Sequence, residues 1–343
     1  MKLIKIGDKV IGGDNPCCII AEAGSNHNGS LEQAKKLIDV AVEAGVDAVK
    51  FQIFEAENLY SKYTPEFSYL KSKNTYELIK SIETPRDWIK ELARYCEEKN
   101  IHFLASAFDF EAVDILDKYV PAFKIASFEI TDLELIKYAA DKGKTMIIST
   151  GMANLGEIED AINAIKSIGN EDIILLHCNS LYPTPAKVVN LRAMETMRTA
   201  FKVPVGFSDH TLGIHIPIAA VAMGACVIEK HFTLDRTLPG PDHSFAIEPD
   251  ELKEMVRCIR EVEKAKGSGI KEKSELESEE MYVKARRSIH VKVDIPKGTK
   301  ITRDMLIIKR PGYGIKPKFI DIVIGRVAKK NIKEDEWITW DMV

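Results

Sequence analysis

The sequence predicts a (β/α)8 barrel, the α/β fold of the TIM type, followed by a small β-rich module. Two observations lead to this prediction. Eight short apolar runs alternate with helical-looking segments, which favours a closed parallel sheet. Each run also ends in a charged or hydroxyl side chain, and the C-terminal ends of barrel strands are where this fold carries its chemistry. The pattern therefore indicates an enzyme and supplies candidate site residues.

The first elements follow in order along the chain. Residues 1–16 predict a short lead-in hairpin with a turn at 12–16. A strand at 18–23 precedes a helix that has Ser30 as N-cap and Gln33 at the capping-box position. That helix places apolar side chains on one face, namely Ala34, Leu37, Ile38, Ala41 and Val42. After a second strand at 47–52, the length of the excursion through 53–83 predicts a functional lid.

The later helices alternate with the remaining strands. A helix is expected at 86–99, where Thr84 is a cap and Pro85 occupies the first helical position. Further helices are predicted at 110–118, 132–142, 155–168, 187–200, 214–224 and 249–265. The strands between them end in the polar residues considered below.

Length and composition divide the chain into two parts. Its 343 residues exceed the roughly 250 of one barrel by the size of a small module. We assign residues 1–266 to the barrel and 267–283, which are polar and short of large apolar side chains, to a linker. Residues 284–343 contain short apolar segments broken by Pro-Gly turns, which is typical of a turn-rich β module.

Composition argues against several classes of function. A net charge of −4 argues against a nucleic-acid partner. No apolar stretch reaches the roughly 18 residues of a membrane span, and no signal-peptide pattern opens the chain. The six cysteines include no CxxC pair, so we expect reduced thiols and a cytoplasmic protein.

His210 and His231 are the candidate metal ligands. They follow the seventh and eighth predicted strands, which are neighbours in a closed barrel. Imidazole suits Mn, Fe, Co or Zn, and two histidines leave open positions for water and substrate. The alternative is a hydrogen-bonded structural histidine, which is the interpretation we favour for His102 and His290.

Lys50 and Lys124 are predicted to project from the second and fourth strands into the same mouth. Two ammonium groups there are unfavourable unless an anion lies between them, so the pair indicates a phosphate or carboxylate ligand. Hydroxyl side chains at equivalent strand ends add donors to this rim, namely Ser106, Ser127, Ser149, Ser180 and Ser208. Solvated lysines and ordinary turn serines are the alternative.

Glu22, Glu129 and Asp242 supply carboxylates, which at a barrel mouth act as general bases or hydrogen-bond a polyhydroxylated substrate. Asp242 lies in the segment LPGPDH (238–243), whose two prolines and one glycine indicate a rigid loop, although a simple turn aspartate is the alternative. In the small unit, Arg310 is either a solvated turn residue or reaches over a barrel mouth to substrate.

These residues occur in motifs that together resemble the sialic acid synthase family over nearly the whole chain. The matching stretches are IAEAGSNH (20–27), VKFQ (49–52), FKIASFE (123–129), STGM (149–152), LHC (176–178), YPTP (182–185), GFSDHT (206–211), EKHFT (229–233) and GPDH (240–243). The C-terminal unit resembles the antifreeze-like (SAF) module of these synthases, with KRP (309–311) as its mark.

The resemblance implies a transferase that condenses phosphoenolpyruvate with an N-acetylated amino-sugar aldehyde and releases phosphate. It implies a divalent metal on His210 and His231, usually Mn²⁺, with Mg²⁺ or Co²⁺ as alternatives. Around the phosphoenolpyruvate it implies Lys50, Ser106, Lys124, Ser127, Ser149, Ser180 and Ser208. Facing the sugar it implies Glu129, Tyr182, Asp242 and Arg310, the last from the partner chain of a domain-swapped homodimer. Glu22 is expected to stabilise the cationic centre or to manage the proton of the attacking water.

The expected reaction is N-acetylneuraminate formation from N-acetylmannosamine. The alternative is the same chemistry on 2,4-diacetamido-2,4,6-trideoxymannose, which gives N,N'-diacetyllegionaminate, or a pseudaminate-type product. Segment 124–129 resembles members that act on bacillosamine-type or pseudaminic-type sugars, whereas 240–243 and 154–159 resemble neuraminate and legionaminate members. A pyruvate aldolase would need no phosphate pocket, and a sugar-binding protein would not explain polar groups at every strand end.

Overall fold

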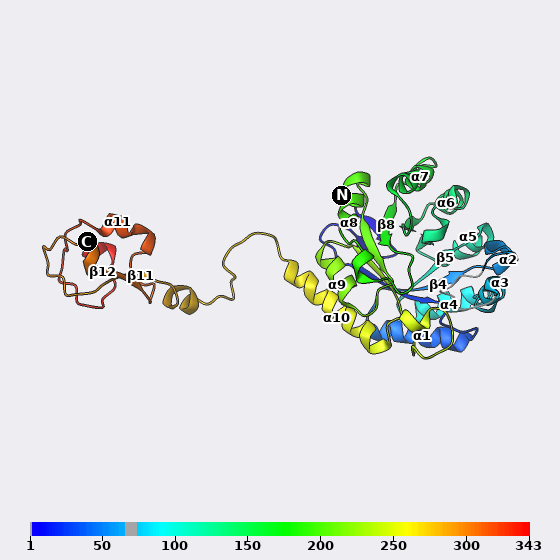
Figure 1. The fold of residues 1–343 in the computed structure, drawn as a ribbon, viewed down its shortest axis with the longest axis horizontal. Coiled ribbons are helices and arrows are strands. Elements are labelled where there is room, and N and C mark those ends of the chain that lie inside the picture. Colours follow the sequence, from blue (N-terminus) through cyan, green and yellow to red (C-terminus); the bar gives the residue numbers. More distant parts are fainter. Residues whose placement is uncertain (1, 66–73) are drawn as a thin grey trace. The chain divides into compact units, whose positions relative to one another are not determined.

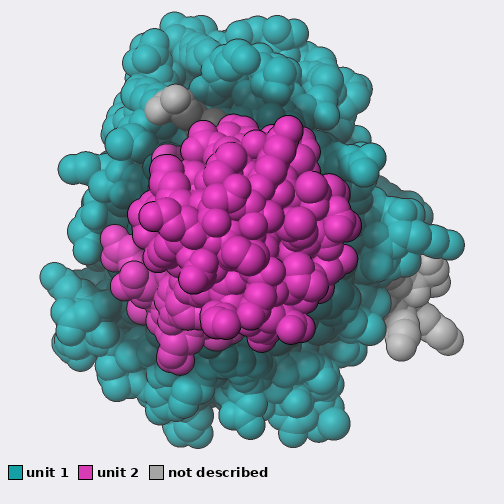
Figure 2. Space-filling model, turned by 90° about the vertical axis from the view of Figure 1, so that its left-hand side faces the viewer, with its two compact units in different colours: residues 1–267 teal, residues 268–343 magenta. Residues whose placement is uncertain are grey.

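The computed structural model describes residues 2–65 and 74–343. The chain forms two compact units, residues 1–267 and 268–343, which Figure 2 distinguishes by colour. The division falls at the start of the segment that the sequence indicates as a linker. Among the described residues, no helix combines the length and the apolarity needed to cross a bilayer.

The first unit is a closed barrel of eight parallel strands, which confirms the predicted fold class (Figure 1). Strand β10 pairs with both β9 and β3, and this pairing closes the sheet. The barrel strands are β3 (Cys18–Gly24), β4 (Ala48–Ile53), β5 (His102–Ala107), β6 (Ala122–Ile125), β7 (Thr145–Ser149), β8 (Ile173–Cys178), β9 (Val205–Asp209) and β10 (Val227–His231).

Helices surround the strands of the barrel (Figure 1), and one of them follows each barrel strand along the chain. They are α1 (Leu31–Ala44), α4 (Trp88–Glu98), α5 (Phe110–Leu116), α6 (Leu133–Ala140), α7 (Leu155–Lys166), α8 (Ala193–Phe201), α9 (His215–Ala222) and α10 (Pro249–Lys266). Each overlaps a helix that the sequence predicts. In α1 the Ser30 hydroxyl accepts from the backbone N–H of Gln33 as predicted, but the Gln33 side chain donates to the Asn26 carbonyl instead of completing the capping box.

Two helix starts differ from the prediction. Helix α4 begins at Trp88, because the Thr84 hydroxyl is bonded to the His27 ring (2.9 Å) and does not cap the helix. Helix α8 begins at Ala193 rather than at 187, because a separate 3₁₀ turn, Ala186–Val188, precedes it. Both errors arise where a side chain or a turn has a tertiary partner that periodicity does not reveal.

The excursion after β4 contains α2 (Ala56–Leu59) and α3 (Thr75–Ser81). The two helices pack through a small apolar cluster of Phe54, Ala56, Tyr76 and Ile79. Residues 66–73 of the predicted lid lie outside the described residues. The parts of the excursion that the structure describes are therefore folded and packed against each other. Movement of the excursion as a lid stays a prediction.

Apolar side chains fill the barrel interior near the N-terminal ends of the strands. The predicted hairpin is present as β1 (Ile4–Ile6) and β2 (Lys9–Ile11), and its isoleucines pack against interior residues of several strands. The Thr145 hydroxyl, at the start of β7, donates to the Lys5 carbonyl (2.7 Å), which places the hairpin at the N-terminal ends of the strands. Polar interior residues are thereby confined to the opposite, C-terminal end.

The second unit is the predicted small β-rich module. Its two-stranded antiparallel sheet joins β11 (Ser288–Val291) to β12 (Leu306–Lys309), and a short helix follows, α11 (Ile320–Val323). Isolated bridges such as Ile295–Ile332 link its turns. The core is a separate apolar cluster that includes Ile289, Val291, Ile301, Leu306, Val323 and Ile338.

Replacing Leu104 by alanine tests the importance of the barrel interior. Leu104 is fully buried among the interior residues of the hairpin and strands. We expect Leu104→Ala to lower the free energy of unfolding by about 2–5 kcal/mol, because the mutation leaves a cavity that neighbouring strands cannot fill. Urea denaturation measures this, with Leu276→Ala as control, since Leu276 is 94% exposed.

Candidate active site at the C-terminal ends of the barrel strands

Strand alternation places the candidate side chains inside the barrel. Each lies two residues after an apolar residue of the interior cluster, and residues two apart on a strand point to the same side. The pairs are Ile20 with Glu22, Ala48 with Lys50, Leu104 with Ser106, Ala122 with Lys124, Ile147 with Ser149, and Val227 with Glu229. The polar layer therefore lies directly above the apolar one.

Two lysines and two glutamates form the centre of this layer. Lys50 Nζ lies 2.8 Å from Glu22 Oε2 and 3.7 Å from Glu229 Oε2, and Lys124 Nζ lies 3.7 Å from Glu229 Oε1. All four side chains are at most 6% exposed. The protein's own carboxylate lies between the lysines, which corrects the expectation that a ligand anion must be there.

Sequence analysis did not select Glu229. The signal was present, because Glu229 precedes His231 by two residues on the same strand and so shares its face. Burial tends to raise the pKa of Glu229, but Lys124 and Lys50 hold it below its ordinary value. Burial and the neighbouring Glu229 raise the pKa of Glu22. The two carboxyls therefore differ in acidity although they share Lys50.

The predicted hydroxyls gather around the lysines. Ser106 accepts from Lys50 Nζ (3.0 Å), and Ser208 donates to Glu229 Oε1 (3.0 Å). Ser127 accepts from the Gly151 backbone N–H (3.0 Å), and a β-carbon at Gly151 would clash with the hydroxyls of both Ser127 and Ser180. Among the described residues, Ser149 Oγ and Ser180 Oγ have no hydrogen-bond partner. They are donors available to an oxyanion.

His210 and His231 lie side by side, with ring centroids 5.3 Å apart. His210 Nδ1 is 2.8 Å from the Asn179 carbonyl, so this nitrogen carries a proton, and Nε2 is the nitrogen that a metal ion would bind once the ring is neutral. Burial opposes protonation of His210, but Cys178 and the Asn179 carbonyl raise its pKa above the ordinary value. Burial holds the pKa of His231 well below its ordinary value, so its ring is neutral. Its Nδ1 has no hydrogen-bond partner among the described residues and lies 3.7 Å from Asp242 Oδ2.

This pair suits a divalent ion that has only two protein ligands. Neutral imidazoles with free lone pairs are ligands for Mn²⁺, Co²⁺ or Zn²⁺. Within residues 2–65 and 74–343, no cluster of three or more His, Cys, Asp or Glu side chains has metal-ligating geometry. A metal here would take its other ligands from water or substrate, as catalytic sites with open positions do.

A pocket of about 370 Å³ lies beside the histidines. Its polar lining residues are Ser25, Gln52, Tyr182, His231, Asp242 and Ser244, and the apolar ones are Ile79, Ile82, Phe128, Pro183, Pro241 and Phe245. Burial and the nearby Glu22 raise the pKa of Asp242 to about 6. The excursion after β4 thus contributes Ile79 and Ile82 to the wall of the pocket.

Two predicted sugar-side residues are not among the described lining residues of this pocket. Glu129 follows β6, and burial raises its pKa to about 7 although Lys124 opposes the shift. Arg310 belongs to the second unit, where its Nε donates to the Ala285 carbonyl (2.5 Å). The structure therefore gathers the predicted barrel residues other than Glu129 around the lysines and the pocket, while the sugar-side roles of Glu129 and Arg310 stay predictions.

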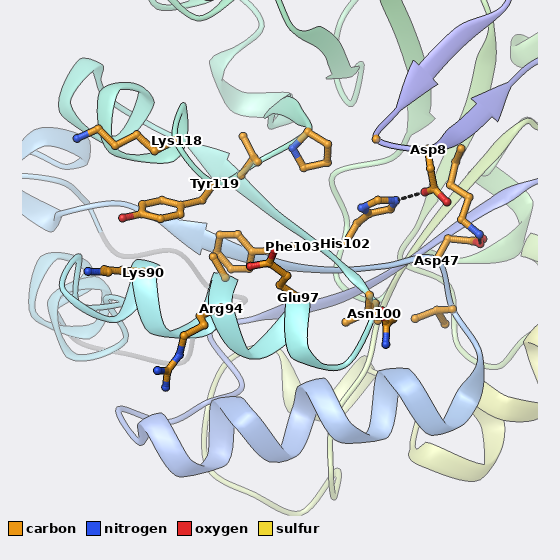
Figure 3. A pocket seen from close by; sticks show the side chains of 17 residues that line it. Asp8, Asp47, Lys90, Arg94, Glu97, Asn100, His102, Phe103, Lys118 and Tyr119 are labelled. Carbon is orange, nitrogen blue, oxygen red and sulfur yellow. Dashed lines mark hydrogen bonds and ion pairs between the residues drawn. The ribbon is translucent and has the colours of Figure 1, made fainter.

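A larger cavity, about 810 Å³, lies at the N-terminal ends of β4 and β5 (Figure 3). Its inner charged groups are paired with one another: His102 Nε2 is 2.5 Å from Asp8 Oδ1, and Lys9 Nζ is 3.0 Å from Asp47 Oδ1. His102 is therefore bonded as a structural histidine would be. This end of the barrel lacks the buried lysine pair of the other end.

The fold and the polar layer together define a barrel enzyme that handles an anionic substrate. Comparison with known proteins identifies the family. Residues 37–271 match the NeuB family and residues 286–343 match the SAF domain, so the chain belongs to the NeuB family. Members of this family are phosphoenolpyruvate-dependent sugar-acid synthases, and this chain is an enzyme of that class.

Three relatives illustrate the range of the family. The chain is 47% identical to the N,N'-diacetyllegionaminic acid synthase of Campylobacter jejuni, over 93% of this chain and 98% of that protein. It is 38% identical to the human N-acetylneuraminate-9-phosphate synthase, over 97% and 94%. The crystal structure of an N-acetylneuraminic acid synthetase from Leptospira borgpetersenii has a TM-score of 0.73 at 39% identity, over 82% of this chain and 95% of that chain.

The raised pKa of Glu129 predicts a pH-dependent stability. Between its ordinary value of 4.5 and about 7, the native protein binds more protons at Glu129 than the unfolded chain does, so stability falls as pH rises through this window. We expect Glu129→Gln to gain stability relative to wild type, on the order of 1–3 kcal/mol, between about pH 5 and about pH 8. Denaturation at both pH values measures this. Glu159→Gln, at an exposed site on α7, should show no such change.

Proposed function

We propose that this enzyme condenses phosphoenolpyruvate with the open-chain aldehyde of an N-acetylated amino sugar and with water, giving a nonulosonic acid and phosphate. The observation that carries the proposal is the buried pair Lys50 and Lys124, surrounded by serine hydroxyls, in the same barrel mouth as the adjacent rings of His210 and His231. An anion with a carboxylate and a phosphate matches the cations and hydroxyl donors of this layer. The histidines lie where the second substrate would present its aldehyde.

The chain's own residues then have distinct tasks. Lys50, Lys124 and the five serines hold phosphoenolpyruvate while its C3 attacks the aldehyde carbon. Water adds at C2, and the C–O bond to phosphate breaks. The lysines stabilise the charge on the departing phosphate. Glu22, whose pKa is raised, takes the proton of the attacking water or stabilises the positive charge that develops at C2.

His210 and His231 are the residues that would hold a divalent ion, which we propose to be Mn²⁺, with Mg²⁺ or Co²⁺ as alternatives. When bound, such an ion supplies Lewis-acid polarisation of the aldehyde oxygen. Asp242, 3.7 Å from His231, faces the same pocket and is placed to orient the sugar.

Two acceptor sugars are candidates. N-acetylmannosamine, giving N-acetylneuraminate, is the acceptor expected from the sequence. The pocket beside Asp242 has an apolar wall of Ile79, Ile82 and Phe128, and its described lining residues include no lysine or arginine. That wall favours a methyl group at C6, hence 2,4-diacetamido-2,4,6-trideoxymannose and N,N'-diacetyllegionaminate, and it disfavours a 6-phosphorylated sugar.

Phosphate release from phosphoenolpyruvate tests the reaction and separates the acceptors. We expect release only when Mn²⁺ and one of the two sugars are present, and none after treatment with EDTA. Lys124→Ala should lower kcat/KM for phosphoenolpyruvate on the order of 100-fold, because the leaving phosphate loses a buried cation. Lys137→Ala, on the exposed face of α6, serves as control. Folded, Mn²⁺-loaded enzyme that releases no phosphate with any acceptor sugar would overturn the proposal.

We further propose that Arg310 contacts the sugar's N-acetyl end from the partner chain of a domain-swapped homodimer, and that the reaction takes place in the cytoplasm. Support for the location comes from the six cysteines, all of which are free thiols. Support for Arg310 comes from its exposed position within the KRP stretch (309–311) of the SAF domain.

Mixing two inactive variants tests the proposed action of Arg310 in trans. A His210→Ala chain and an Arg310→Ala chain are each expected to have little activity. After dissociation and reassociation, random pairing gives half heterodimers with one intact site each, so about a quarter of wild-type activity should return. No activity above that of either variant, with heterodimers verified by mass, would contradict action in trans.

A further inference from the structure

The loop after β10 carries Asp242 and Phe245 on one 3₁₀ turn, His243–Phe245, with Asp242 at its start. Both residues line the acceptor pocket, whereas His243, between them, does not. Phe245 packs against the ring of His231 with centroids 5.1 Å apart, and Asp242 lies 3.7 Å from the same ring. The position of this turn therefore decides where two pocket residues lie relative to His231.

His243 is held from both sides by loops of different origin. Its Nε2 is 3.0 Å from Asn28 Oδ1, in the loop after β3, and its Nδ1 is 2.6 Å from the Thr233 hydroxyl, directly after β10. The ring is 1% exposed, and burial lowers its pKa, so it is neutral. Because a carbonyl oxygen only accepts, Nε2 carries the proton and donates to Asn28, and Nδ1 is left as an acceptor for the Thr233 hydroxyl. That hydroxyl is nearer to Nδ1 (2.6 Å) than to the Asp235 carbonyl (3.1 Å), the other acceptor for its single hydrogen.

The backbone at Gly240 packs closely against the ring. Gly240 has φ +144°, and a β-carbon there would stand 2.8 Å from His243 Cδ2 and 3.3 Å from Asn28 Oδ1. A second bond joins the same two loops, since the Asn26 side chain donates to the Phe232 carbonyl (2.8 Å). Asn26 and Asn28, which the proposed chemistry does not use, thus support the loop that carries Asp242.

We infer that His243 is a positioning residue for the acceptor sugar: clamped between Asn28 and Thr233, it fixes the 3₁₀ turn that presents Asp242 and Phe245 to the pocket. The inference rests on the proposed function for its catalytic consequence, but the clamp itself is a property of the free protein. The lysine layer makes no hydrogen bond or ion pair with this turn among the described residues, and only the charges of Glu22 and Lys50 act on Asp242, so we expect phosphoenolpyruvate binding to change little when the turn shifts.

Steady-state kinetics distinguish positioning from a general structural role. We expect His243→Ala to raise KM for the acceptor on the order of tenfold and to lower kcat by a similar factor, since a small displacement of orienting groups has effects of that size. KM for phosphoenolpyruvate and the affinity for Mn²⁺, measured by electron paramagnetic resonance, should stay within about twofold. His243→Gln, which keeps a donor toward Asn28, should recover most of the loss.

Two further comparisons complete the test. Asn28→Ala should reproduce the acceptor defect, and Asn28→Ala with His243→Ala should be no worse than either single variant, because both remove one clamp. His102→Ala, which breaks the bond to Asp8 at the opposite end of the barrel, is the matched control and should leave acceptor KM unchanged. Equal changes in both substrate KM values, or none in a folded protein, would overturn the inference.

Hydrogen exchange separates this inference from the proposed function. Amides 242–246 should exchange on the order of tenfold faster in His243→Ala than in wild type, whether or not any sugar is turned over. If the wild-type enzyme released no phosphate, the proposed function would be overturned, but hydrogen exchange at amides 242–246 would still test the clamp. Unchanged exchange in this segment would overturn the clamp even in an active synthase.

Discussion

The buried ion pairs between Lys50, Glu22, Glu229 and Lys124 are the interaction on which the rest of the barrel depends. Removing an ammonium or a carboxylate from water costs several kcal/mol, and the cost is offset only while each charge keeps a close partner. Lys50 has two such partners, and Lys124 shares one of them. Loss of one member leaves an uncompensated buried charge, so strand register at this level must hold all four together.

The same arrangement governs how an anion enters. Glu229, whose pKa the two lysines hold below its ordinary value, lies within 3.7 Å of both ammonium groups, so an incoming phosphate or carboxylate competes with Glu229 for them rather than meeting a bare positive pocket. The hydroxyls of Ser149 and Ser180, which lack partners in the described structure, add binding that the carboxylates do not contest. The affinity for the anion is therefore the difference between its contacts with the lysines and serines and the lysine–Glu229 contacts that it replaces. This small difference favours release of phosphate after the reaction.

Most of the barrel and much of its site could be predicted from the sequence, because both follow from local patterns. A short apolar run that ends in a polar residue indicates a strand and the end of it that lies at the barrel mouth. This pattern was sufficient to select Lys50, Lys124, His210 and His231 as candidates. Glu229 was missed because pairing across the mouth depends on closure of the sheet, which brings β10 beside β3. Strand spacing alone does not indicate which carboxylate will lie between two lysines.

Tertiary partners explain the other failures. Thr84 has the sequence of a helix cap, yet its hydroxyl is bonded to His27, a residue 57 positions away. The role of Asn28 and His243 was equally hidden, because a contact between residues 215 positions apart leaves no periodic signal. Loops after strands are where such long-range bonds concentrate, so sequence patterns locate the strand ends better than they locate the loop residues that complete the site.

At the C-terminal mouth of the barrel, different residues serve the anion and the acceptor sugar, so the two binding functions can change independently. Both lysines and the hydroxyls of Ser106, Ser149 and Ser208 come from the strands themselves, and Ser127 and Ser180 follow two residues after a strand. The acceptor pocket instead takes Ile79, Ile82, Asp242 and Phe245 from the segments that connect strands to the next helices. Strand residues are constrained by the barrel, but loop residues can vary without disturbing the buried charges. Relatives at 36–47% identity are named as legionaminic, pseudaminic and N-acetylneuraminate-9-phosphate synthases. Different acceptors on one condensation chemistry are what this separation predicts, since a new sugar requires new loops and the same lysine layer.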